Sequence, residues 1–130
     1  MKPEPQHHIR FARPTRDIEA AIRFWVDGVG LPLQGRQEDE VSGHKLAFIG
    51  WPDATWHLEI VQDDTLQPTP SAEDLFVIYL GGTIDEDAIS RIEHAGGVRV
   101  AARNPYWDQH GMTFTDVDGY LLVLVTRSWA

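Results

Sequence analysis

The chain has 130 residues, enough for one packed domain or for two small modules that share a core, but not for several independent domains. Its 20 acidic and 11 basic residues give a net charge of −9, which argues against binding to nucleic acids or anionic membranes, since these normally require a basic surface. It has no cysteine, which excludes disulfides, thiolate metal ligands and a cysteine nucleophile, and it is 42% hydrophobic, which is enough to form a core.

The polar N-terminal residues bear on the expected cellular location of the protein. The first eight residues are polar and include two prolines. They lack the apolar region of a signal peptide, and no apolar run approaches the roughly 20 residues of a membrane helix. We therefore expect a cytoplasmic protein that contacts neither membranes nor nucleic acids.

The first half of the chain predicts one strand, one helix and three further strands. Alternation over residues 8–13 indicates a half-buried strand with His8 and Arg10 on one face. The helix is expected to begin with Thr15 as its N-cap and to end near Gly28. The further strands are expected at residues 31–36, 45–49 and 55–61.

The same order of elements restarts after residues 63–72, which are rich in Pro, Asp and Thr and are typical of a linker. The expected elements are a strand over 75–80, a helix over 84–92, a loop over 104–111, and strands over 98–102, 112–115 and 120–125. We therefore expect one domain, 1–130, that comprises a first module over 7–62, a linker over 63–72 and a second module over 73–127.

Four short segments, in order along the chain, carry a family resemblance. They are HIRF at 8–11, FWVDGVGL at 24–31, HLEI at 57–60 and DVDGY at 116–120. In this order they resemble the vicinal oxygen chelate superfamily, which includes glyoxalase I, extradiol dioxygenases, fosfomycin-resistance thiol transferases and bleomycin-resistance proteins. The segment NPYWD at 104–108 resembles one uncharacterised bacterial branch of that superfamily.

The resemblance implies a fold and an assembly. The expected fold class is α+β, with two βαβββ modules whose mixed sheets curl into a cup, as in the glyoxalase, bleomycin-resistance and dihydroxybiphenyl dioxygenase fold. The chains of this superfamily commonly pair, so the resemblance also implies a homodimer. The ligand is expected to be a small molecule held in the cup.

The resemblance further implies where a metal ion would bind. In metal-using members the ligands lie inside the cup, on the first and last strands of each module. These positions fall on His8, Glu59, Asp74 and Val123, and a valine cannot ligate. The expected set is therefore His8, Glu59 and Asp74, an incomplete site for Zn, Mn, Ni or Fe. His57 lies on the same strand face as Glu59 and could replace a ligand or orient Glu59.

Six residues are candidates to contact a ligand because their side chains combine apolar area with polar tips, or carry a positive charge suited to an anionic substrate. They are Arg10, His57, Arg103, Tyr106, Trp107 and Asp108. For the two arginines the alternative is an ordinary salt bridge, and for the aromatic pair it is a clamp that fixes the loop to the sheet.

The sequence is consistent with three functions. The first is a small-molecule binding protein that uses the cup as a pocket, which the missing fourth ligand favours. The second is a metal-dependent lyase, isomerase or dioxygenase-like enzyme in which Glu59 ligates the ion or acts as a base on a carbon beside a carbonyl. The third is a non-catalytic dimerisation module.

Overall fold

The computed structural model describes all residues from 1 to 130, and its first module follows the predicted order closely. Residues 1–8 precede the first strand without regular structure. The elements of this module are β1 (Ile9–Pro14), α1 (Ile18–Ile22), the π-helical segment η1 (Arg23–Val29), β2 (Leu33–Glu38), β3 (Lys45–Ile49) and β4 (Trp56–Gln62).

The second module repeats this order and adds one short helix. Its elements are β5 (Leu75–Tyr79), α2 (Glu86–His94), β6 (Val98–Val100), α3 (Pro105–His110), β7 (Gly111–Thr115) and β8 (Leu121–Val125). The added helix is α3, and it falls where the sequence predicted a loop. Asn104 caps it by accepting a hydrogen bond from the Tyr106 amide, and Pro105 occupies its first turn, which suits a residue without an N–H.

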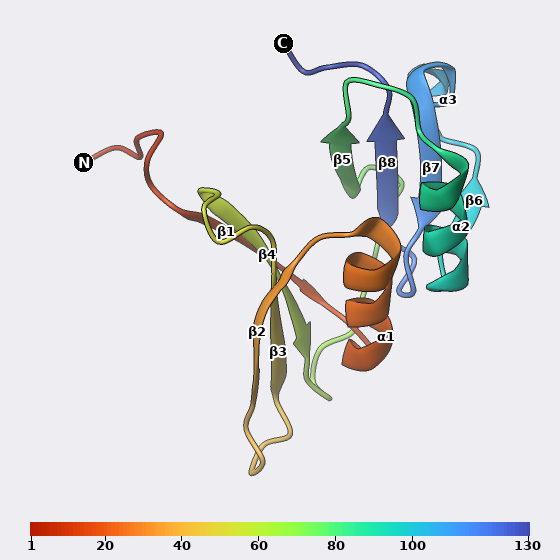
Figure 1. Cartoon of the computed structure of the whole chain (residues 1–130). Helices are drawn as coiled ribbons and strands as arrows, with labels where there is room; N and C mark the ends of the chain where they lie inside the picture. The colour runs from red at the N-terminus through yellow and green to blue at the C-terminus, as the bar shows by residue number, and fades with distance from the viewer.

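The strands form two separate sheets of four, with the orders β1-β4-β3-β2 and β5-β8-β7-β6. In each sheet the first and last strands of the module pair in parallel, and the other pairs are antiparallel. The expected α+β fold of two mixed-sheet modules is confirmed. Within one chain the sheets diverge and do not close into a barrel (Figure 1).

One hydrophobic core lies between the two sheets and joins the modules. Phe24 and Trp25 from η1 are fully buried there beside Leu58 from the first sheet and Phe114 from the second. Gly28 allows α2 to approach η1, because a side chain at this position would collide with Ala95. Because one face of each sheet points into this shared core, the opposite faces of both sheets point outward.

The start of the first helix differs from the prediction. Asp17, not Thr15, is the N-cap, and its carboxylate accepts a hydrogen bond from the Ala20 amide. Thr15 is buried and donates instead to the carboxylate of Asp118, at 2.6 Å, in the turn before β8. The sequence could not indicate this contact because it joins the two modules. None of the helices is long and apolar enough to cross a membrane.

Candidate functional site

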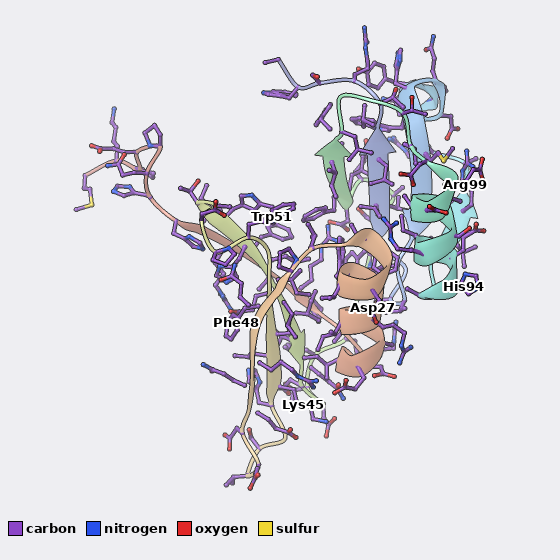
Figure 2. All side chains as sticks on the ribbon, viewed as in Figure 1. Asp27, Lys45, Phe48, Trp51, His94 and Arg99 are labelled. Atoms are coloured by element: carbon purple, nitrogen blue, oxygen red, sulfur yellow. The ribbon has the colours of Figure 1, made fainter.

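Four of the predicted residues meet on the outward face of the first sheet. The parallel register of β1 and β4 places Arg10 beside His57 and Ala12 beside Glu59. Because alternate residues of a strand point to the same side, His8, Arg10, His57 and Glu59 share one face. Phe48 of β3 is in register with Glu59 and lies on the same side, away from α1 (Figure 2).

The two histidines are in direct contact. His8 Nε2 and His57 Nδ1 lie 2.7 Å apart, so one of them donates a hydrogen bond to the other. The Phe48 ring meets the His57 ring nearly edge-on, with 5.9 Å between the ring centroids. The other nitrogen of His57, Nε2, is buried without a hydrogen-bond partner and lies 3.6 Å from Glu59 Oε1. This nitrogen is the one unsatisfied polar atom of the cluster.

Arg10 holds the Glu59 carboxylate. Its Nε donates a hydrogen bond to Glu59 Oε2, and its Nη2 completes an ion pair with the same oxygen. The two partners differ in exposure, since 55% of the Arg10 side chain but only 4% of the Glu59 side chain is accessible to solvent. A buried carboxylate is stable when a cation is held against it, and here the chain supplies that cation itself.

The charge balance of the pair follows from this geometry. Burial raises the pKa of Glu59, but the hydrogen bond and charge of Arg10, together with His57, outweigh burial and hold the pKa below its ordinary value. The hydrogen bond to Glu59 raises the pKa of Arg10. Glu59 is therefore ionised at neutral pH with its charge balanced by Arg10, which makes it a weak base. Both contacts from Arg10 go to Oε2, whereas Oε1 faces His57 Nε2.

The expected metal set of His8, Glu59 and Asp74 does not assemble within the chain. Asp74 lies just before β5 in the other module, where its carboxylate accepts a hydrogen bond from the Ser71 amide at 2.6 Å. No group of three or more His, Cys, Asp or Glu residues converges anywhere in the chain. Val123, at the fourth position, is fully buried. Within one chain the expected donors thus do not make up the set of about three protein ligands that a catalytic zinc site uses.

The remaining predicted ligand residues lie on and beside α3, which is remote from β1 (Figure 1). Arg103 pairs with Glu73, with 3.2 Å between nitrogen and oxygen, and the Asp108 carboxylate accepts from the Ala102 amide. Both charges therefore have local structural partners. The Tyr106 ring packs against the rings of Trp107 and His110, with centroids 5.1 and 4.6 Å apart. Within one chain, this aromatic group lies apart from the cluster of His8, Arg10, His57 and Glu59, which we call the His8 cluster.

The largest cavities lie elsewhere, between residues of the two modules. One, of about 410 Å³, is lined only by apolar and aromatic residues, which include Trp51, Trp56 and Tyr79. A neighbouring cavity of about 420 Å³ shares Trp51 and extends toward the start of α2. Trp51 lies near the upper end of the first sheet, on the side that faces the second sheet (Figure 2). The first cavity has no charged group, and the second has Asp85, whose carboxylate accepts a hydrogen bond from the Ala88 amide at the start of α2, and Arg91.

The sequence is similar to proteins of one named family over almost its whole length. Residues 9–61 match the YycE-like N-terminal domain, and residues 73–126 match the YycE-like C-terminal domain. The uncharacterised protein YycE of Bacillus subtilis strain 168 is 34% identical over 120 residues, which are 90% of this chain and 86% of that protein.

Solved structures give the same placement. YycE from Bacillus subtilis, a protein of unknown function, has a TM-score of 0.85 at 30% identity, covering 96% of this chain and 93% of that one. TnmS3, an antibiotic-binding protein from Streptomyces sp. CB03234, has a TM-score of 0.61 at 27% identity, covering 94% and 96%. The fosfomycin-resistance protein FosX from Listeria monocytogenes, complexed with Mn(II) and sulfate, has a TM-score of 0.68 at 17% identity, covering 94% and 91%, and shares the fold. Taken with the match across both modules, these similarities place the chain in the YycE-like family of the vicinal oxygen chelate superfamily.

Proposed function

We propose that this protein binds a small organic molecule on the outward face of the first sheet and does not depend on a bound metal ion. The observation that carries the proposal is the Arg10–Glu59 pair, which neutralises the only buried carboxylate of that face. A ligand there meets the exposed part of the Arg10 guanidinium, the edge of His57 and the ring of Phe48. This mixture of one aromatic wall with a few polar groups is typical of ligand pockets.

A second copy of the chain completes the pocket in this proposal. The outward faces of both sheets carry apolar side chains that are only partly buried, among them Leu46, Phe48, Val77 and Tyr79. Sheet faces of this kind are stable when they are covered. Pairing the first sheet of one copy with the second sheet of another would bury both faces and bring α3 toward the His8 cluster. The similarity to TnmS3, an antibiotic-binding protein, supports a binding role.

A metal-dependent lyase, isomerase or dioxygenase-like activity is the second candidate, and one observation favours it. His57 Nε2 is buried, unpartnered and 3.6 Å from Glu59 Oε1, with His8 adjacent. Zn, Mn, Ni or Fe would use His57 Nε2 together with Glu59 Oε1, the carboxylate oxygen that Arg10 does not contact. The two candidates differ in whether Arg10 alone, or Arg10 together with a metal ion, balances the carboxylate.

Elemental analysis of untagged protein, purified without chelator, separates the two candidates. The wild type, His8→Ala and Glu59→Ala would each be measured as purified and after incubation with Zn, Mn, Ni and Fe(II). The proposal expects no stoichiometric metal in any of them. Near-stoichiometric metal in the wild type that disappears in both variants would overturn it. Glu19→Ala is the matched control, because Glu19 is also paired with an arginine, Arg36, but lies on the surface.

A thermal-shift screen of small organic molecules tests binding directly, because a ligand specific for the native state raises Tm. Compounds that stabilise the wild type should lose their effect in Phe48→Ala and keep it in the presence of EDTA. Stabilisation that EDTA abolishes would support the metal-dependent candidate. Sedimentation velocity on the same samples would test the second copy, because the proposal requires a dimer.

A further inference from the structure

Arg13 is a charged side chain placed on the inner face of its strand. It follows Ile9 and Phe11 at alternate positions of β1 and pairs in register with Ile60, a core residue. Its side chain therefore points away from the Arg10–Glu59 face and toward the junction of the two modules. Only 6% of the residue is accessible to solvent. A guanidinium is rarely buried to this extent unless a carboxylate neutralises it.

No protein group neutralises Arg13 at close range. Nη1 is buried without a hydrogen-bond partner, and Arg13 takes part in none of the ion pairs of the structure. Asp116 and Asp74 lower the cost of its charge only from a distance. Both are already engaged, since Asp116 accepts hydrogen bonds from the Asp118 and Tyr120 amides and Asp74 accepts one from Ser71.

Aromatic rings surround the guanidinium and leave its N–H groups free. The Arg13 Cζ atom lies 4.6 Å from the ring centroid of Tyr120, 5.4 Å from that of Phe11 and 6.0 Å from that of Phe76. Such cation–π contacts stabilise the charge through the faces of the rings. They do not replace the five N–H donors around the edge of the guanidinium, which are suited to a bidentate anion.

A cavity adjoins this group. It has a volume of about 250 Å³ and is lined by Phe11 and Arg13 of β1 and by Leu75, Phe76 and Val77 of β5. Apart from Arg13 its walls are apolar. We propose that this cavity is a second binding site and that it takes a small organic acid, whose carboxylate pairs with Arg13 while its apolar body packs against Phe11 and Phe76.

The ligand proposed here does not contact the residues of the His57 and Glu59 face, although Val77 also lies on the sheet face that a second copy would cover. Arg13 and Arg10 lie on opposite faces of the same strand, so a ligand at one does not contact the other. The chemistry also differs, because the outward face presents a neutralised ion pair whereas the junction presents an uncompensated positive charge. The loss of binding at either site would leave the other proposal standing.

Benzoate is a suitable probe because it joins one carboxylate to one small ring. Titration of the whole chain by calorimetry, with amide chemical shifts followed by NMR, should give saturable binding and shift the amides of Phe11 and Val77. Benzamide, which has the same shape without the charge, should bind at least tenfold more weakly. An Arg13→Met variant should bind benzoate at least tenfold more weakly than the wild type, whereas Arg99→Met, which removes an exposed arginine, should bind it unchanged.

Several outcomes would overturn the proposal. They are no saturable binding of benzoate to the wild type, equal affinity in Arg13→Met, and shifts centred on His57 and Glu59 in place of Phe11 and Val77. A change in oligomeric state in Arg13→Met would also overturn it, since the partner of Arg13 would then be a second copy. Should Arg13→Met fail to fold, Phe11→Ala removes a half-exposed wall of the same cavity and should weaken benzoate binding at least threefold.

Discussion

The outward faces of the two sheets have the same architecture and opposite chemistry. Glu59 in β4 and Val123 in β8 both lie on a strand with neighbours on either side, and both are almost completely buried. Arg10, one strand away, neutralises Glu59, whereas Val77 and Thr113 flank Val123 in register. A carboxylate is therefore buried at this position in the sheet where a neighbouring strand supplies a cation, and an apolar side chain is buried where no cation is supplied.

The largest expected effect comes from giving the second face the residue of the first. Val123→Glu places a carboxylate at a fully buried position that has no cation beside it. We expect a loss of at least about 3 kcal/mol of unfolding free energy and a fall in Tm of about 10 °C or more, measured by urea and thermal denaturation. Val123→Thr is the control for the loss of methyl contacts. A wild-type Tm in Val123→Glu would show that the second face can hydrate a charge.

The next largest effect is a difference in stability between removing Arg10 and removing the charge of Glu59. Arg10→Met leaves the buried Glu59 carboxylate without its cation and should give the larger loss of stability in urea denaturation at pH 7, with a fall in Tm of several degrees. Glu59→Gln leaves a half-exposed guanidinium that water can solvate, so it should cost only about 1 kcal/mol. Arg36→Met, in the surface pair with Glu19, should cost less than about 1 kcal/mol. Equal costs for Arg10→Met and Glu59→Gln would contradict the burial difference.

The pH dependence of stability tests the same ion pair between Arg10 and the buried Glu59. The folded state lowers the pKa of Glu59 below its ordinary value of 4.5, so the pair stabilises the protein above about pH 4.5. This contribution is lost as the pH falls below 4.5 and through the folded pKa. Tm measured between pH 7 and pH 3 should therefore fall more steeply in the wild type than in Arg10→Met. Parallel curves would mean that Arg10 does not set the pKa of Glu59.

The smallest expected effect concerns an exposed carboxylate just beyond the same strand. Hydrogen bonds from Thr65, and then from His44, lower the pKa of Asp63 to about 2, although its side chain is accessible to solvent. Water competes for these bonds, so Asp63→Asn should change Tm at pH 7 by no more than a degree or two. A larger loss than in Arg10→Met would show that the pKa shift, and not burial, determines what a carboxylate contributes to stability.

Local sequence patterns predicted most of the fold, because alternation and glycine positions are properties of neighbouring residues. The strand expected over 45–49 has those bounds in the structure, and the others differ by a few residues. The segment of α3 predicts a loop because Asn104, Pro105 and Gly111 are residue types common in loops, although Asn followed by Pro is also typical of the start of a helix. Thr15 was misassigned because its partner, Asp118, lies in the other module.

The candidate site was predictable only in part. The face shared by His8, Arg10, His57 and Glu59 requires the parallel register of β1 with β4, which no local pattern contains. A salt bridge of Arg10 is one of the alternatives that the sequence offers, but its partner Glu59 could not be identified from a local pattern. Arg13 did leave a signal, since it continues the alternating face of Ile9 and Phe11 as an arginine among apolar side chains.

The parallel pairing of the first and last strands of each module constrains how the chain folds. β1 cannot be paired until β4 has been made, and β5 cannot be paired until β8 has, so neither sheet is complete before its whole module is available. Contacts between residues far apart in sequence slow folding relative to folds built from local contacts. During synthesis the first sheet can close against α1 while the second is still emerging, but η1 lacks its contacts with α2 and Phe76 until the C-terminal module arrives.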